Sequence, residues 1–209
     1  MSDGQTIAEV IAAQVTAPAA GRPDTRVGGW MITFTGRRFW PLDPRPNEVD
    51  IRDIAHSLSL KCRYGGHTRR HFSVAEHCCL MAGHFIRLGR PDLARWALMH
   101  DGAEAYGLGD AIRPVKPFLD GFAAIEAEVA EAIFVHVGLS GEMPPEVKAA
   151  DNAIIGDEAR AMFSPAQIRE AGWVLDWEPL GVTVTGQRAE WAEANFLTLF
   201  HMLFPGLAR

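Results

Sequence analysis

The stretch Ala97–Asp110, with the sequence ALMHDGAEAYGLGD, places a histidine and an aspartate side by side directly after an apolar run. If the helix suggested by the preceding residues continues, Glu104 lies four residues after His100 and three after Asp101, so all three side chains share one face. Burying carboxylates on an apolar helix costs several kcal/mol unless a cation or strong donors compensate. The stretch therefore indicates either a metal site or an exposed turn whose polar residues face solvent.

The length and composition are those of one globular domain. The chain has 209 residues, of which 48% are hydrophobic and 22% are charged, and it can bury a single sizeable core. No apolar run reaches the roughly 18 residues that a membrane helix requires, and the start MSDGQTIAEVIAAQV lacks the basic cluster of a secretory signal. We therefore expect a cytoplasmic location and no membrane partner.

Charge and cysteine content narrow the classes of partner and cofactor. The formal net charge of -6 disfavours an extended nucleic-acid surface, although a small anionic substrate needs only a local positive pocket. Cys62, Cys78 and Cys79 are odd in number and include no Cys-x-x-Cys pair. This pattern argues against both a disulfide framework and a thiolate zinc site.

The N-terminal part predicts a lead-in followed by a hairpin. We predict that residues 1–26 form a loose segment with a short helix from Ile7 to Val15. Residues 27–209 are predicted to form a single domain. Within that domain, Met31–Thr35 and Arg38–Trp40 are spaced as two short strands around a tight turn. Because an isolated hairpin is only marginally stable, we expect it to pack against the helical body as a lid or wall beside the site.

The remainder of the chain shows helical periodicity. Asn47 or Asp50 can cap the first helix, and Ser73 with Glu76 has the pattern of a capping box at the second. Residues 164–187 show no regular pattern. Helices are predicted over Ile51–Leu60, Val74–Leu88, Pro91–Tyr106, Phe118–Val137, Glu146–Met162 and Arg188–Phe204. The predicted fold class is therefore all-α, a helical bundle with a small N-terminal β-hairpin.

Three of these helices carry side chains suited to one metal ion. His77 lies in the first turn of its helix, nearer the basic loop than His84, and Asp151 lies among small apolar residues, where an aspartate either faces outward or is paired. A mixed set of two imidazoles and two carboxylates suits one divalent transition-metal ion, such as Mn, Fe, Co, Ni or Zn, and leaves positions for water and substrate. The candidate ligands are His77, His100, Asp101 and Asp151.

Basic residues lie close to these ligands in the sequence. The loop Cys62–His71 contains three arginines, and a further basic turn follows Asp110. Arginine and lysine in such loops can hold a phosphate group, although a solvated basic loop has the same composition. The candidate anion-binding residues are Arg63, Arg69, Arg70, Arg113 and Lys116.

The order of His77, His100-Asp101 and Asp151 in a helical chain resembles the HD superfamily of metal-dependent phosphohydrolases. The segment HDGAEAYGLGDAIRPVK resembles more narrowly the branch related to bacterial 5'-deoxynucleotidases. A subgroup of that branch common in bacteria and phages is resembled by the upstream segment, ITFTGRRFWPLDPRPNEVDIRDIAHSLSLKCRYGGHTRRHFSVAEH. The resemblance covers about residues 32–160.

The resemblance implies roles for further residues. Glu104 and Asp110 would serve the chemistry and the nucleotide, and Arg63 and Tyr64 would contact the nucleotide. Tyr64 stands where the best-studied deoxynucleotidases have tryptophan, which leaves the base and sugar preference open. Only His136 lies between the His-Asp pair and the final aspartate. This favours one metal ion over the two found in HD proteins that cleave cyclic dinucleotides.

The function expected from these residues is a metal-dependent phosphohydrolase that releases phosphate from a small-molecule nucleotide, a (deoxy)nucleoside 5'-monophosphate. Water activated by the cation would attack phosphorus, and Glu104 would handle the proton. Asp110 would hold a sugar hydroxyl or assist the leaving oxygen. The alternatives are a triphosphate triphosphohydrolase, a non-catalytic nucleotide-binding module and a metal-free scaffold. A homodimer is compatible with the apolar terminal helices.

Overall fold

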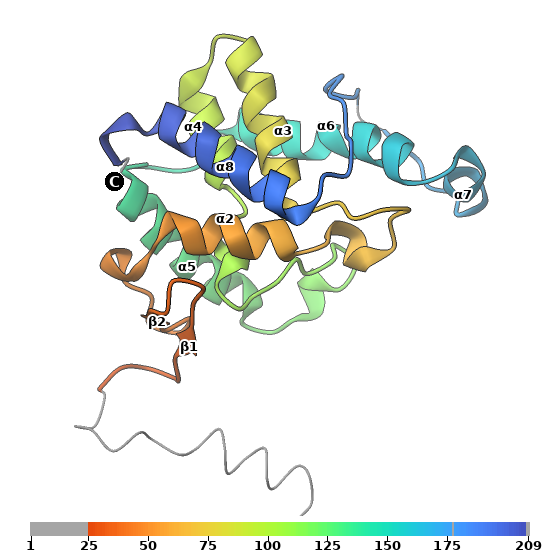
Figure 1. Ribbon diagram of the computed structural model, residues 1–209. Coiled ribbons are helices and arrows are strands. Elements are labelled where there is room, and N and C mark those ends of the chain that lie inside the picture. Colours follow the sequence, from red (N-terminus) through yellow and green to blue (C-terminus); the bar gives the residue numbers. More distant parts are fainter. Residues whose placement is uncertain (1–24, 177, 208–209) are drawn as a thin grey trace, which may run out of the picture.

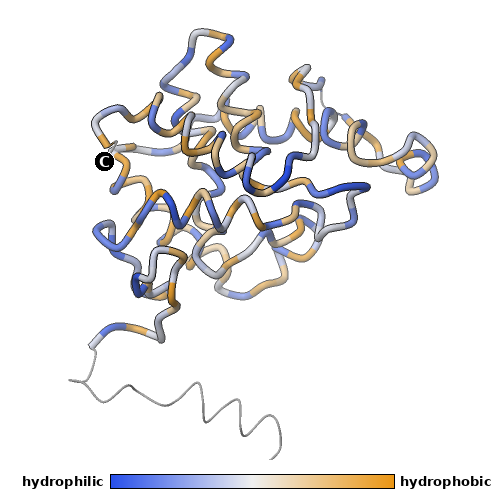
Figure 2. The backbone as a smooth tube through the Cα atoms, in the orientation of Figure 1, coloured by the Kyte–Doolittle hydropathy of each residue, from blue (hydrophilic) through white to orange (hydrophobic). Residues whose placement is uncertain are grey.

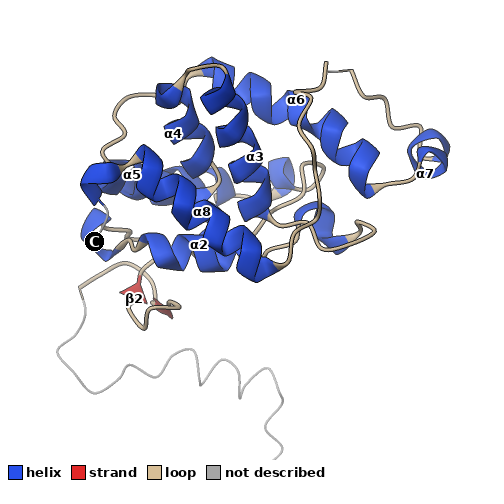
Figure 3. Ribbon diagram, turned by 45° about the horizontal axis from the view of Figure 1, so that its top comes forward, coloured by secondary structure: helices blue, strands red, loops and turns tan. Residues whose placement is uncertain are grey.

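The computed structural model describes residues 25–176 and 178–207, and the short helix predicted for Ile7–Val15 lies outside them. Within these ranges the chain is mostly helical with one two-stranded antiparallel hairpin, so the predicted all-α class with a small hairpin is confirmed (Figure 1 and Figure 3). No helix among the described residues combines the length and apolar character needed to span a membrane. The elements are β1 (Met31–Ile32), β2 (Arg38–Phe39), α2 (Ile51–Leu60), α3 (Val74–Arg87), α4 (Pro91–Met99), α5 (Phe122–Val137), α6 (Pro145–Met162), α7 (Pro165–Glu170) and α8 (Ala189–Leu203).

The helices surround one main hydrophobic core. Helix α3 packs against α4, and α8 lies across α2 and α3 (Figure 1). Hydrophobic and hydrophilic residues alternate along the helical segments, which gives the surface helices an apolar face (Figure 2). Most of the large side chains buried in this core come from α2, α3, α4, α5, α6 and α8, and include Ile54, Leu58, Met81, Leu98, Ile133, Ile154, Phe196 and Phe200.

Helix α3 begins at the predicted cap, but Glu76 has an unexpected partner. The Glu76 N–H donates to Ser73 Oγ at 3.1 Å, which is one half of the predicted capping box. The buried Glu76 carboxylate instead accepts hydrogen bonds from residues 185–187, through their three N–H groups and the Thr185 hydroxyl. This carboxylate therefore ties the segment before α8 to the start of α3.

The hairpin is shorter than predicted and supports the fold rather than the site. Met31 pairs with Phe39, and the buried Phe39 ring stacks on Tyr106 with 3.8 Å between centroids. Thr35 donates both its N–H and its hydroxyl to Asp53 of α2. None of the hairpin residues lines the cavity beside the predicted metal ligands. The expectation of a lid or wall was therefore wrong, because these contacts hold the hairpin against α2 and the chain after α4.

Helix α4 ends at Met99, earlier than predicted. Asp101 has φ -96° and ψ 13°, and Gly102–Ala105 form a separate 3-10 turn, so the prediction of one helix through Tyr106 was wrong. The turn that follows the break packs against α5. A Cβ on the first residue of the turn would lie 3.3 Å from Ile133 Cδ1, so the chain passes close against α5 at this point.

The helix predicted over Phe118–Val137 was too long at its start. Helix α5 begins at Phe122, because Gly121 adopts φ 76° and Pro117 lies in a separate 3-10 turn, Lys116–Phe118. The other predicted helices agree with the structure to within one residue at each end.

Arg26 is anchored in the domain, although it was assigned to the loose lead-in. Its guanidinium pairs with Asp43 and Glu48 and lies over Trp40, 4.1 Å from the ring centroid. The side chain is 7% exposed. The packed part of the chain therefore begins before the predicted boundary.

Candidate functional site

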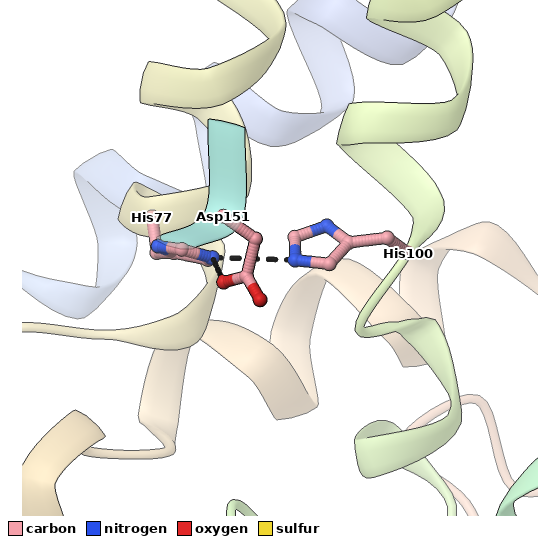
Figure 4. Close-up of side chains that lie close together, drawn as sticks. All are labelled: His77, His100 and Asp151. Carbon is pink, nitrogen blue, oxygen red and sulfur yellow. Dashed lines mark hydrogen bonds and ion pairs between the residues drawn. The ribbon is translucent and has the colours of Figure 1, made fainter. Parts of the chain in front are cut away.

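The two predicted histidine ligands face each other near the start of α3 and the end of α4. His77 Nδ1 donates to Glu158 Oε1 at 2.6 Å, and His100 Nδ1 donates to the Ala97 carbonyl at 2.9 Å. With both Nδ1 atoms acting as donors, the Nε2 atoms carry the free lone pairs, and they lie 3.3 Å apart (Figure 4). Two lone pairs at this separation repel each other unless a proton or a cation lies between them.

Two carboxylates converge on the same point. Asp101 Oδ2 lies 3.3 Å from His100 Nε2 and 3.7 Å from His77 Nε2. Asp151 Oδ1 lies 3.5 Å from His77 Nε2 (Figure 4). Bonds of about 2.1 Å to a cation, set at right angles, place neighbouring ligand atoms about 3 Å apart. The structure thus brings the two predicted carboxylates to the two imidazoles. The ligand atoms of His77, His100 and Asp151 lie within 4.8 Å of one another, a spacing that could hold a metal ion, and Asp101 belongs to a second such group through His100.

The charges in this cluster favour a positive ion. Burial and Arg63 lower the pKa of His77, but the carboxylates of Glu158 and Asp151 outweigh them and raise it to about 9. Burial raises the pKa of Asp151, yet its bond to His77 and the charge of His100 hold that pKa well below the usual range. The surrounding groups therefore stabilise positive charge at the Nε2 atoms.

Cys78 and His84 are not among the predicted ligands, although Cys78 forms a second group of possible metal ligands with His100 and Asp101. Cys78 Sγ lies 3.9 Å from His100 Nδ1, the nitrogen that already donates to a backbone carbonyl. Burial raises the pKa of this thiol, which disfavours the thiolate that a metal would need. His84 packs edge-on against Phe85, with 5.4 Å between ring centroids. The cluster is therefore built from imidazoles and carboxylates.

Glu158 is a site residue that sequence analysis missed. It is fully buried on α6 and also accepts hydrogen bonds from Arg63 and Tyr64. Burial raises its pKa, but the charges of Arg63 and His77 outweigh burial and lower it to about 2. By holding the His77 Nδ1–H, the carboxylate directs Nε2 toward the cluster, as outer carboxylates do at metal sites. Its position seven residues after Asp151, about two turns along one helix face, was the available signal.

Replacing Glu158 with glutamine should weaken metal binding about 10-fold to 100-fold, because a neutral amide holds the His77 N–H less strongly. Competition against a chromogenic chelator measures the affinity. Glu146→Gln changes an exposed glutamate in the first turn of the same helix and should bind metal like the wild type. An unchanged affinity in Glu158→Gln would show that His77 is oriented without this carboxylate.

Glu104 lies beside the cluster with one oxygen unpartnered. The residue is 6% exposed, and its Oε2 is buried with no hydrogen-bond partner among the described residues. Burial and the negative charges of Asp101 and Asp110 raise the pKa of Glu104 to about 10. Burial also raises the pKa of Asp110. A nearby cation stabilises a buried acidic group. The unpartnered Glu104 Oε2 is therefore consistent with a metal ion bound at the cluster.

A cavity of about 540 Å³ adjoins the cluster, a volume within the range of small-molecule sites. Asp101, Glu104, Asp110 and Asp151 all contribute to its lining. Its basic lining residues are Arg63, Arg113, Lys116 and Lys148. The cavity thus presents candidate metal ligands, candidate proton carriers and several cations to one small molecule.

Four predicted substrate-binding residues line this cavity: Arg63, Tyr64, Arg113 and Lys116. The Arg63 side chain is 12% exposed, with Nη1 3.6 Å from Asp101 Oδ2. Arg113 Nη2 lies 3.1 Å from Asp151 Oδ2. These two cations therefore lie next to candidate metal ligands.

Arg69 and Arg70 lie outside the cavity lining. Arg69 Nη2 donates to the Ala161 carbonyl at 2.7 Å, and the Arg70 side chain packs closely beside Gly186. The structure therefore gives no support to their predicted role in binding substrate. Sequence analysis missed Lys148, whose Nζ lies 2.7 Å from Asp151 Oδ2, although its spacing of three residues on α6 was a signal.

Two curated proteins resemble the chain over much of their length. Uncharacterized protein RCAP_rcc00048 of Rhodobacter capsulatus is 36% identical over 145 residues, which cover 66% of this chain and 72% of that protein. Uncharacterized protein YfdR of Escherichia coli (strain K12) is 35% identical over 128 residues, which cover 61% of this chain and 69% of that protein. No protein-family model matches the chain. The chain therefore belongs to the family that includes RCAP_rcc00048 and YfdR.

Proposed function

We propose that the protein is a metal-dependent phosphohydrolase that releases orthophosphate from a (deoxy)nucleoside 5'-monophosphate. The observation that carries this proposal is the meeting of two imidazole Nε2 atoms and two carboxylates beside a cavity lined by cations. Mixed nitrogen and oxygen ligands with open positions are typical of hydrolytic metal sites. The resemblance of the His-Asp motif to HD phosphohydrolases supports the same chemistry.

The residues that would hold the metal ion are His77, His100, Asp101 and Asp151, and the candidate ions are Mn, Co, Ni, Fe and Zn. When bound, such an ion acts as a Lewis acid toward a phosphoryl oxygen and lowers the pKa of water. Glu158 and the Ala97 carbonyl keep the two Nδ1 protons in place, so both imidazoles can serve as neutral ligands.

Arg113 and Lys148 would bind the phosphate. The Arg113 side chain is 54% exposed and the Lys148 side chain 59% exposed, and both form ion pairs with Asp151 Oδ2. Exposed ion pairs are weak, so either cation can turn toward phosphate oxygens at small energetic cost. Arg63 is buried and held by Glu158, and it would supply a fixed positive charge near Asp101 that stabilises the charge developing on phosphorus oxygens.

Glu104 would accept a proton from the attacking water. Its Oε2 has no competing hydrogen bond among the described residues, and the residue lines the cavity. Positive charge at the cluster would lower the raised pKa of Glu104 and so favour the carboxylate form that a general base needs. Asp110 lines the same cavity and would hold a sugar hydroxyl or assist the leaving oxygen.

One observation favours a second candidate, a (deoxy)nucleoside triphosphate triphosphohydrolase. Arg113, Lys116 and Lys148 all line the cavity, and a triphosphate would use more of these cations than one phosphoryl group requires. Such an enzyme would release triphosphate instead of orthophosphate. The two candidates therefore differ in their product.

Product analysis tests the proposed function. Nucleoside and deoxynucleoside mono- and triphosphates are incubated with the protein and Mn, Co, Ni, Zn or Mg, or with chelator. We expect metal-dependent orthophosphate release from monophosphates. Triphosphate release from triphosphates would establish the second candidate. Nucleotide binding without turnover under any of these conditions would indicate a non-catalytic binding module, and purified protein without stoichiometric metal or nucleotide binding would indicate a scaffold.

A further inference from the structure

Helix α7 has well-formed caps at both ends although it buries none of its six residues. Ser164 and Gln167 form a complete capping box at its start. At its end, Gly172 adopts φ 61°, and the Trp173 N–H donates at 3.0 Å to a carbonyl in the helix, as in a Schellman motif. The helix lies at one extremity of the molecule (Figure 1). Its caps therefore set the direction of the residue that follows it, Trp173.

Trp173 returns from α7 to the cavity beside the metal-ligand cluster. Its ring lies edge-on to Phe163, with 5.7 Å between centroids, and to Tyr64, with 6.0 Å between centroids. The side chain is half-buried and lines the cavity together with Val174 and Leu175. The chain after α7 thus supplies an aromatic and apolar part of the cavity wall.

Tyr64 contacts Trp173 from an unfavourable backbone conformation. It has φ 56° and ψ 30°, in the left-handed region that residues with a side chain rarely adopt. Strain of this kind gathers at functional sites, where the surrounding structure maintains it. The Tyr64 hydroxyl donates to Glu158, which also holds His77. The Trp173 ring is therefore connected through Tyr64 and Glu158 to the candidate metal ligands.

We propose that Trp173 makes the site prefer nucleotides to base-free sugar phosphates by stacking against the nucleobase of the substrate. The cavity combines cations for an anionic group, Arg113 and Lys148 among them, with an aromatic wall for a flat ring. Aromatic side chains stack on any base because every base has a π-face. This inference rests on the proposed function, in which the phosphate lies at the cations and the metal ligands.

The test compares a nucleoside 5'-monophosphate with ribose 5-phosphate, which carries the phosphate and the sugar without a base. Isothermal titration calorimetry with Mn in a Glu104→Gln background, in which turnover is slowed, measures both affinities. Adenosine, guanosine, cytidine and uridine 5'-monophosphates are titrated in turn. At least one should bind more tightly than ribose 5-phosphate, and Trp173→Ala should lower that affinity ratio about 5-fold to 100-fold. Trp173→Phe should restore most of the ratio.

Phe163→Leu is the matched control, because it removes another ring from the same contact while Phe163 does not line the cavity. It should leave the affinity ratio unchanged, and thermal unfolding verifies that both variants fold. The inference is overturned if Trp173→Ala leaves the ratio of nucleotide to ribose 5-phosphate affinity unchanged, or if Phe163→Leu lowers that ratio equally. It is also overturned if no nucleotide binds more tightly than ribose 5-phosphate.

The two proposals fail in different ways. A Trp173-dependent ratio without phosphate release from any nucleotide would contradict the proposed function and retain base recognition by Trp173. Phosphate release from nucleotides without that dependence would retain the proposed function and remove the role of Trp173.

Discussion

Asp101→Ala should remove the bound metal and the hydrolytic activity together. Asp101 Oδ2 lies 3.3 Å from His100 Nε2, and its loss leaves the cluster with one ligand and one negative charge fewer. Loss of the Lewis acid removes several kcal/mol of transition-state stabilisation, so turnover should fall on the order of 10³-fold or more. Metal content of the purified variant and its rate of orthophosphate release measure the two effects.

Asp92→Ala provides the comparison for that variant. Asp92 lies in the first turn of α4, where it is 60% exposed and pairs with Arg90 at the surface. This variant should keep both metal and activity. Stoichiometric metal and full turnover in Asp101→Ala would show that Asp101 is not a required ligand and would contradict the four-ligand assignment.

Glu104→Gln should keep the metal and lose turnover by about 10²-fold to 10⁴-fold, the usual contribution of a general acid or base. The amide has nearly the same shape as the carboxylate but cannot accept the proton from water. Glu104 lines the cavity without belonging to the group of ligand atoms formed by His77, His100 and Asp151. Metal content measured beside the rate of orthophosphate release separates proton transfer from metal binding.

Glu131→Gln changes an exposed glutamate of α5 and should retain wild-type metal content and turnover. If Glu104→Gln were as active as Glu131→Gln, water would be activated without this carboxylate. If Glu104→Gln lost its metal, Glu104 would be a ligand instead of a proton acceptor.

Most helix bounds could be predicted because they depend on signals a few residues away. Asp50 accepts the Arg52 N–H at the start of α2, and Gly138 ends α5 with φ 73°. Such caps act locally, whatever the rest of the chain does. The end of α4 could not be found in this way, because its C-cap residue His100 keeps helical angles, φ -62° and ψ -35°, and no glycine in the left-handed region marks it.

The arginines of the basic loop show the same difference between what a local pattern predicts and what a distant contact decides. Arg63, Arg69 and Arg70 stand in one short segment, and composition cannot tell them apart. Arg63 reaches the cavity because Glu158 of α6 holds its guanidinium. Arg69 donates instead to a backbone carbonyl at the end of the same helix. The partner on α6, rather than the loop itself, decides where the side chains of Arg63 and Arg69 lie.

By itself, the sequence determined the all-α class and the identity of the residues that meet in the candidate metal cluster, since helical periodicity and the motif around His100 are local patterns. Only the tertiary structure decided that Glu158 orients His77 and that Trp173 lines the cavity. Glu158 lies 81 residues from His77 along the chain, and Trp173 reaches Tyr64 from α7. Such pairs acquire a physical relation only when packing brings distant helices together, so a local pattern can place a residue on a helix face but cannot identify its partner.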